Sequence, residues 1–432
     1  SPKHQLRQAL QNPTVDIKTY GVYGLFSFLL TDEIRSLERA LGKPLADTLL
    51  SFALTRWAYQ SPIKRAPFYH AHHCRSDVWN ADTALTDKTL SAALKSVGEN
   101  RQAVVQWLKG LLPPSAAGES FLLMDSTHVM SASEQLEVNT KGYNNSFDFG
   151  KQVRLMYLFS AKMKLPVYYR LLGGNIVDVA AMALCVEEMG LSDVVYIADK
   201  GFYSAANVAM LEARHLRYII PVRRDNRQID YSPLEDGEFK AKHGRFVWQG
   251  RIIWCYRHEA GGQAFVTYLD DRLRVEEEQD YLVRITTHPD AYTEEGYRER
   301  LRRFGTLTLT YHLEGERGPE EVYTAYKRRN EIEMMFDSYK NFMKGDVTYM
   351  QNRYVLEGWL FANFLAMMAW YKLYDKLREA KLLGNYSPKD MIEMSKTVYK
   401  LRIGGTWRLA EVTAKLRKLL VKAGIDYLNE RS

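Results

Sequence analysis

The 432-residue sequence predicts a mixed α/β fold with a β-rich insertion and flanking helical regions. Between residues 116 and 222, short apolar runs typical of buried strands alternate with helical stretches. Residues 223–320 contain strand-like runs separated by glycine turns, which favours a β-rich segment. Residues 1–115 and 353–432 carry apolar residues at helical spacing. We therefore expect a core, residues 116–222 and 321–352, that the insertion at 223–320 interrupts.

The predicted core has a characteristic order of elements. Three strands come first, followed by a helix, a strand, a second helix and a last strand. The strands are expected at Phe121–Met124, Val153–Phe159, Val167–Leu172, Val194–Ala198 and Tyr218–Val222, and the first helix at Ile176–Met189. This is the order of elements in an RNase H-like fold.

The insertion is predicted to contain four strands, because each run is short and rich in β-branched and aromatic residues. The strands are expected at Phe246–Trp248, Ile252–Tyr256, Phe265–Leu269 and Tyr281–Ile285. The basic run Arg298–Arg303 is interpreted as a solvated, helix-like face.

Helical regions precede and follow the core. In residues 1–115, apolar repeats at Leu45–Tyr59 and Leu90–Leu112 predict helices. This region is compatible with DNA binding and equally with a structural cap, since no helix-turn-helix signature decides between them. In residues 353–432, the stretch Tyr354–Leu383 predicts one long helix.

Composition narrows the choice of partner and compartment. The formal net charge of +7 permits a polyanionic partner. Cys74, Cys185 and Cys255 lie far apart without CxxC spacing, which indicates no disulfide framework and fits a reducing cytoplasm. No apolar run reaches the ~20 residues that a membrane span needs, and no signal peptide is expected.

One stretch, Tyr323–Lys340, carries an unusual set of polar residues. Tyr326, Arg329, Glu333 and Lys340 follow one another at steps of three, four and seven. On one continuous helix these positions fall within roughly a 60° arc of a single face. Apolar residues on the adjoining side predict that the helix packs against the sheet. From this pattern alone, Glu333 is either an ordinary solvated glutamate or a carboxylate held over a site.

Two aspartates are predicted to meet this glutamate. Asp125 and Asp199 each follow an apolar strand, and groups beyond strand ends gather at one edge of an open α/β sheet. Taken singly, each aspartate also fits a turn residue. Together with Glu333 they form a set of carboxylates that needs cations nearby, and hard oxygen ligands favour Mg²⁺ or Mn²⁺. Two such ions support in-line phosphoryl transfer on nucleic acid.

The spacing Tyr-x2-Arg-x3-Glu-x6-Lys resembles the YREK signature of DDE transposases of bacterial insertion sequences, in the IS-four type family. Asp125 in LLMDST, Asp199 in ADKGFY and the segment LLGGNIVD at Leu171–Asp178 also resemble the family pattern. The likeness covers roughly residues 116 to 380. It implies a cytoplasmic DNA transposase that binds terminal inverted repeats, cleaves at the ends and transfers the strand to target DNA. It further implies two Mg²⁺ or Mn²⁺ ions per active site and a homodimer on paired double-stranded DNA ends.

The resemblance also assigns roles to the residues that match. It implies that Asp125, Asp199 and Glu333 are the catalytic metal ligands. Tyr326, Arg329 and Lys340 are then expected to contact phosphates near the cleaved end, Arg329 through two parallel hydrogen bonds and Lys340 as a point charge.

Related enzymes stack a flipped base on an aromatic residue of the insertion. Trp248 and Trp254 are the candidates here, and Trp248 is preferred because it stands at a strand end before Gly250. Core packing is the alternative for both. Two other functions stay open: a metal-dependent endonuclease of the same fold, and a domesticated, non-catalytic DNA-binding protein.

Overall fold

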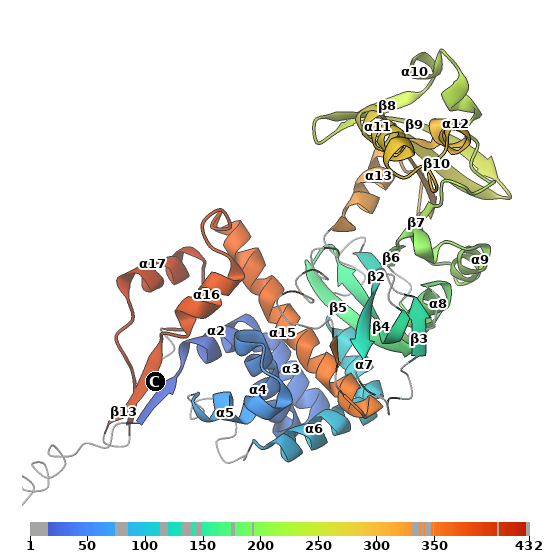
Figure 1. Ribbon diagram of the computed structural model, residues 1–432. Coiled ribbons are helices and arrows are strands. Elements are labelled where there is room, and N and C mark those ends of the chain that lie inside the picture. The colour runs from blue at the N-terminus through green and yellow to red at the C-terminus, as the bar shows by residue number, and fades with distance from the viewer. Residues whose placement is uncertain are drawn as a thin grey trace, which may run out of the picture.

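The computed structural model consists of a helical part, a central sheet and the insertion, which lies beyond the sheet (Figure 1). The structure describes residues 16–73, 85–112, 120–131, 133, 136, 140–143, 149–173, 178–191, 194–330, 333, 337, 341, 347–348, 350–403 and 406–428.

One large sheet passes through the central part and the insertion. Among the described residues, eleven strands join it in the order β3-β4-β2-β6-β7-β11-β10-β9-β8, with β5 paired to β4 and β12 paired to β2. The parallel pairs are β2–β6, β6–β7 and β2–β12. The strands are β2 (Ser120–Ser131), β3 (Thr140–Tyr143), β4 (Phe149–Ser160), β5 (Leu165–Gly173), β6 (Val194–Ile197), β7 (Arg217–Val222), β8 (Gly244–Trp248), β9 (Arg251–Ala260), β10 (Gln263–Asp270), β11 (Thr306–His312) and β12 (Val347–Thr348). The predicted mixed α/β fold is confirmed.

The core elements lie close to their predicted positions, with one informative difference. β4, β5, β6 and β7 cover the expected strands, and α8 (Asp178–Met189) and α9 (Ala205–Ala213) are the helices between them. β2, however, does not end at Asp125 but continues to Ser131. The reason is that antiparallel β4 pairs with β2 as far as Met130, whereas parallel β6 pairs with it only from Ser120 to Leu123. Asp125 therefore lies in β2, just beyond the point where its parallel neighbour stops.

The insertion extends the core sheet. β8, β9 and β10 cover three of the predicted strands. β11 was not predicted, although its sequence TLTLTYH alternates as a strand should. It pairs with β7 on one side and β10 on the other, so the sheet is continuous from core to insertion. The short helices of this part are η4 (Ser232–Glu235), α10 (Phe239–Lys242), α12 (Glu294–Arg300) and η5 (Leu301–Arg303).

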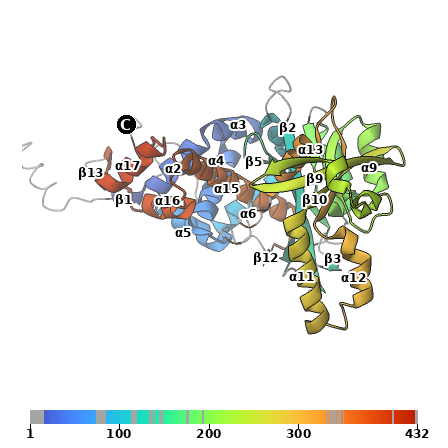
Figure 2. The ribbon, with the colours of Figure 1, turned by 90° about the horizontal axis from the view of Figure 1, so that it is seen from above.

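The strand predicted at Tyr281–Ile285 is wrong, because these residues belong to helix α11 (Asp271–Thr287). The Asp270 side chain caps this helix by accepting hydrogen bonds from the amides of Arg272 and Leu273. Of the helix residues only Tyr281 is buried, so the short apolar run reflects one anchoring side chain rather than a strand. Figure 2 shows α11 and α12 projecting together from the sheet.

The helical part is built around the long helix α15 (Arg353–Glu379), which covers most of the predicted Tyr354–Leu383 helix. Around it stand α2 (Gly21–Leu29), α3 (Thr31–Leu41), α4 (Lys43–Tyr59), η1 (Ile63–Arg65), α5 (Ala66–Ala71), α6 (Asp87–Glu99), α7 (Arg101–Gly110), α16 (Pro388–Ser395) and α17 (Ala414–Lys422). A separate small sheet joins β1 (Asp16–Thr19), β13 (Tyr399–Ile403) and β14 (Thr406–Leu409) in that order. Within the described residues, no helix combines the length and apolar content needed to cross a membrane.

Two glycines allow α6 and α15 to cross at very close range. A Cβ added at Gly358 would lie 2.0 Å from the backbone oxygen of Leu94, and one added at Gly98 would lie 2.0 Å from the backbone oxygen of Tyr354. Since no side chain tolerates such a contact, this crossing depends on both glycines. It ties α15 to the helices of the N-terminal region.

Candidate active site

The parallel pairing of β2 and β6 places Asp125 and Asp199 side by side. Leu123 of β2 is the partner of Ile197 of β6, and each aspartate lies two residues further along its chain. Asp199 keeps an extended backbone, with φ −80° and ψ 167°, so its chain continues in the strand direction. Because residues two apart share a face and neighbouring strands lie about 4.8 Å apart, both carboxylates project from adjacent points of the same sheet face.

The helix predicted over Tyr323–Lys340 is interrupted in the structure. Helix α13 (Pro319–Lys327) ends before Arg328 and Arg329, which form a turn. The amide of Arg329 donates to the carbonyl of Tyr326, three residues back rather than four. Among the residues described beyond the turn, Asn330, Glu333, Asp337 and Asn341 are helical. The prediction of one continuous helix was therefore wrong, because a tightened turn replaces the regular α-helical bonding there.

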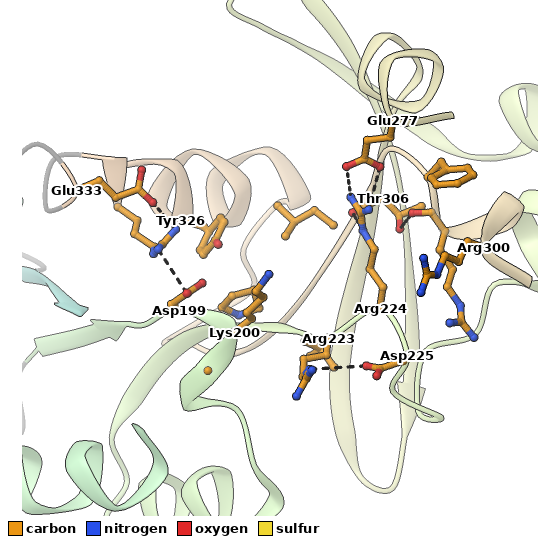
Figure 3. A pocket seen from close by; sticks show the side chains of 17 residues that line it. Asp199, Lys200, Arg223, Arg224, Asp225, Glu277, Arg300, Thr306, Tyr326 and Glu333 are labelled. Carbon is orange, nitrogen blue, oxygen red and sulfur yellow. Dashed lines mark hydrogen bonds and ion pairs between the residues drawn. The ribbon is translucent and has the colours of Figure 1, made fainter. Parts of the chain in front are cut away.

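Arg329 contacts all three predicted carboxylates from this turn. Its Nη2 lies 3.7 Å from Asp125 Oδ2 and 3.5 Å from Asp199 Oδ2, and its Nη1 lies 2.9 Å from Glu333 Oε1. Figure 3 shows Asp199, Tyr326 and Glu333 around this point. The Nε of Arg329 is buried without a hydrogen-bond partner among the described residues. One guanidinium thus gathers carboxylates from β2, from the end of β6 and from the helix after α13.

Burial and neighbouring charges shift the pKa values of Arg329 and Tyr326 in opposite directions. Burial by itself lowers the pKa of Arg329, but the neighbouring anionic groups, Asp199 first, outweigh it and raise the pKa above its usual value. Burial raises the pKa of Tyr326 to about 12, against the lowering effect of Arg329. The arginine is therefore charged and the phenol neutral across the physiological pH range. Glu333 is the most open of the three carboxylates, with its side chain 52% exposed against 17% for Asp125.

Comparison with known protein families agrees with this geometry. Residues 116–369 match the model of the family described as Transposase DDE domain. This chain belongs to the DDE transposase family. No curated protein matches it. Among solved structures, the chain resembles the piggyBac transposase in a synaptic complex with hairpin DNA, at 10% sequence identity and a TM-score of 0.43. That match covers 86% of this chain and 78% of the other.

The donor set of the transposase site suits a hard divalent cation. All three carboxylates converge on a single positive group, and carboxylate oxygens are the ligands that Mg²⁺ and Mn²⁺ prefer. In the structure these carboxylate oxygens are spaced around the guanidinium of Arg329. No group of three His, Cys, Asp or Glu in the described part of the chain stands in a metal-binding arrangement. The residue types fit the ion, while the separation of the oxygens must shorten to hold it.

The two candidate tryptophans lie in different surroundings. Trp254 is 8% exposed and packs with Phe239, Tyr256 and Leu269 in a small apolar cluster. Trp248 is half-buried against α13, where its ring lies 5.5 Å from that of Tyr323. Since a stacked base needs an open ring face, these positions favour core packing for Trp254 and keep Trp248 as the better candidate. Lys340 lies outside the described residues.

Lys327 is a site neighbour that the sequence pattern did not single out. Its Nζ lies 5.4 Å from the centre of the Trp248 ring and 5.1 Å from that of Tyr323. Burial lowers its pKa below the usual lysine value. Because Lys327 is the last residue of α13, these contacts connect Trp248 to that helix. A lysine four residues after an aromatic on one helix was the available signal, but it is common on helices.

Two residues beside the aspartates, His128 and Lys200, have separate surroundings. The Nε2 of His128 lies 2.9 Å from Nη2 of Arg154 on the neighbouring strand. Lys200 follows Asp199 and lines the cavity next to the carboxylates. Of the two, only Lys200 is among the residues that line that cavity.

Proposed function

We propose that this transposase cuts and joins DNA at the ends of a bacterial insertion sequence of the IS-four type. In this proposal it binds terminal inverted repeats as a homodimer in the cytoplasm, cleaves at the ends and transfers the 3′ strand to target DNA. The observation that carries it is the contact of Arg329 with Asp125, Asp199 and Glu333. An RNase H-like arrangement of the core fits the parallel β2–β6–β7 order.

Asp125, Asp199 and Glu333 are the proposed ligands of two Mg²⁺ or Mn²⁺ ions. When bound, such ions activate the attacking oxygen and stabilise the leaving oxygen in an in-line displacement at phosphorus. The aspartates come from neighbouring strands of a sheet, which gives them a fixed separation. Glu333 lies beyond the turn, has the most exposed side chain of the three and is the carboxylate best placed to adjust.

Arg329 has two proposed tasks. Near the carboxylates its positive charge offsets their mutual repulsion, which otherwise disfavours their ionised forms. Since Arg329 lines the cavity beside the carboxylates, its guanidinium is also proposed to donate to a phosphate oxygen of the DNA end. Tyr326, neutral at physiological pH, is proposed to donate from its hydroxyl to the same strand. Lys340 is proposed as a further phosphate contact, and Trp248 as the stacking platform.

Cleavage of plasmid DNA tests this proposal. A supercoiled plasmid carrying the inverted repeats that flank the gene is incubated with the full chain and Mg²⁺. Wild type is expected to nick at the repeat ends and to join them to target DNA. Asp125→Asn is expected to do neither, while Asp236→Asn, which removes an exposed carboxylate paired with Lys242 far from the site, behaves as wild type.

Other outcomes of that experiment separate the alternatives. Nicking without joined product would identify an endonuclease. Binding of the repeats with no nicking by wild type would show a DNA-binding protein without catalysis, and the proposed function would fail.

A further inference from the structure

A long cavity leads away from the carboxylates toward the insertion. Its volume is about 1020 Å³, and it begins at Asp199, Tyr326, Arg329 and Glu333. From there it passes the end of β7 and reaches the segment of α12 and η5 (Figure 3). The candidate active site is therefore one end of a larger groove rather than an isolated pocket.

The far part of this groove is lined by four arginines that differ in how they are paired. Arg224 is fully engaged: its Nη1 and Nη2 lie 2.8 and 3.0 Å from the two carboxylate oxygens of Glu277, and its Nε donates to the Thr306 carbonyl at 2.8 Å. Arg223 has a loose contact, 3.8 Å, with exposed Asp225. Arg224 thus holds the base of the insertion together, while Arg223 is only weakly neutralised.

Arg300 and Arg303, the other two arginines that line the groove, have no acidic partners among the described residues. Among the described residues, no carboxylate lies within ion-pair distance of either side chain. The guanidinium of Arg300 lies over the ring of Tyr281, 5.2 Å from its centre, a cation–π contact that orients the guanidinium without neutralising its charge. The Nε of Arg303 is buried and has no hydrogen-bond partner in the described part of the chain. Unpaired cations that face one another in a groove repel, so this arrangement is favourable only when an anion enters.

Arg302 lies in different surroundings from Arg303. It is the immediate neighbour of Arg303, yet it lines a different cavity, whose charged side chains are of both signs: Glu235, Arg274, Glu278, Arg298 and Glu299. Its Nη1 lies 3.2 Å from Glu235 Oε1. The consecutive residues Arg302 and Arg303 thus line different cavities, and only Arg302 has a carboxylate within ion-pair distance among the described residues.

We propose that Arg223, Arg300 and Arg303, here called the arginine wall, bind the phosphates of the DNA strand that extends from the carboxylate site toward the insertion. The proposal rests on the proposed function, because it takes the polyanion in the groove to be the DNA being cleaved. A strand that occupies the carboxylate end must continue in some direction, and the groove offers it a positively charged path. The arginine wall then positions the strand without touching the reacting phosphate.

Binding measured against salt concentration tests the arginine wall directly. A fluorescent duplex with the terminal repeat and its flank is titrated with the full chain in EDTA, so cleavage does not interfere. Removing one phosphate contact reduces the slope of log K against log salt by about 0.9, or about fivefold in affinity at 0.15 M salt. Arg303→Gln is expected to show this loss, and Arg300→Gln with Arg303→Gln about twice the change in slope. Arg302→Gln, which removes the same charge one residue away, should leave the slope at the wild-type value.

Neutral DNA linkages locate the contact. Methylphosphonates are placed singly on either side of the cleavage position, and wild type is compared with Arg303→Gln. At the contacted phosphate the two changes should not add, since both remove the same interaction. If losses add at every position, or if Arg302→Gln and Arg303→Gln weaken binding equally, the arginine wall is only a part of the general positive charge.

Two further arms keep this inference separate from the proposed function. Inorganic phosphate, matched for ionic strength with chloride, should not displace the duplex; displacement would identify a small-anion site instead. Wild type and Arg303→Gln are also assayed for cleavage with Mg²⁺. Cleavage with an unchanged salt slope overturns the arginine wall but not the transposase mechanism. If Arg303→Gln reduces the salt slope but wild type does not cleave, the arginine wall is supported as a DNA contact and the proposed mechanism is overturned.

Discussion

Arg329 and Arg101 both gather acidic groups, but in opposite settings. Arg101, at the start of α7, donates through Nη2 to Glu188 Oε2 at 2.9 Å and to the backbone carbonyl of Tyr169 at 2.6 Å. Its guanidinium also lies 4.8 Å from the centre of the Tyr169 ring and 5.6 Å from that of Tyr168. Arg329 instead meets three carboxylates, of which Glu333 is the most exposed.

The two sites differ in the groups that surround each arginine. Around Arg101, Tyr168 also donates its hydroxyl to Glu188, and the ring of Tyr169 lies against the guanidinium. Around Arg329, three carboxylates share one cation, and two of them, Asp199 and Glu333, line the groove. An arginine held by a carboxylate, a backbone carbonyl and packed rings stabilises the fold, whereas three carboxylates around one arginine beside a groove are suited to binding. Four substitutions test this distinction, from the largest expected effect to the smallest.

Asp125→Asn should remove activity and leave stability nearly intact. The amide keeps the size of the carboxylate but loses its charge, so we expect DNA cleavage to fall by roughly 1,000-fold, the scale of losing one electrostatic group from a catalytic centre. The free energy of unfolding in urea should change by no more than about 0.5 kcal/mol. A large loss of stability would show that Asp125 is needed for folding, and the contrast with Arg101 would disappear.

Arg101→Met should have the reverse effect. It leaves Glu188 partly buried without its main partner, and we expect the free energy of unfolding to fall by about 2–4 kcal/mol. Cleavage per folded molecule, assayed at low temperature, should stay close to wild type. If folded Arg101→Met protein failed to cleave, the Arg101 network would have to act on the active site as well as on the fold.

Gly358→Ala tests the same helical part by packing alone. The new methyl group would meet the Leu94 carbonyl oxygen, and relieving this contact is expected to cost about 1–3 kcal/mol of unfolding free energy. The control is Gly110→Ala at the end of α7, where nothing lies within 4 Å of the added Cβ. There the change should be neutral or stabilising by up to about 1 kcal/mol. Equal losses in both variants would mean that the α6–α15 crossing is not the tight contact.

Tyr326→Phe should produce the smallest change. Because burial raises the pKa of Tyr326 to about 12, the phenol is protonated at every pH well below that value. Wild-type cleavage should therefore show no descending limb from this residue between pH 7 and pH 10. Loss of its hydroxyl should lower cleavage about tenfold at most, the effect of one hydrogen bond, with the pH profile unchanged. A limb near pH 10 that vanishes in Tyr326→Phe would contradict a buried, neutral phenol.

The local pattern of the sequence was enough to predict most core strands and the residues that meet at the candidate site. Buried strands such as β4 to β7 are encoded by short apolar runs, which are visible without knowledge of their partners. Asp125 and Asp199 stood out because each follows such a run, and Glu333 because of its spacing from Tyr326, Arg329 and Lys340. Tyr281–Ile285 was misassigned for the same reason, since a short apolar run does not by itself distinguish a strand from a helix with one buried side.

Only the tertiary structure decided how these elements meet. The pairing of Leu123 with Ile197, which brings the two aspartates together, depends on strand register, and register is a contact between distant segments. The turn at Arg328 and Arg329, which lets one guanidinium reach three carboxylates, interrupts a pattern that is locally helical. The division of Arg302 and Arg303 between two cavities follows from the path of η5 over the insertion. The sequence by itself determined which groups are present, and packing between distant segments determined which of them face one another.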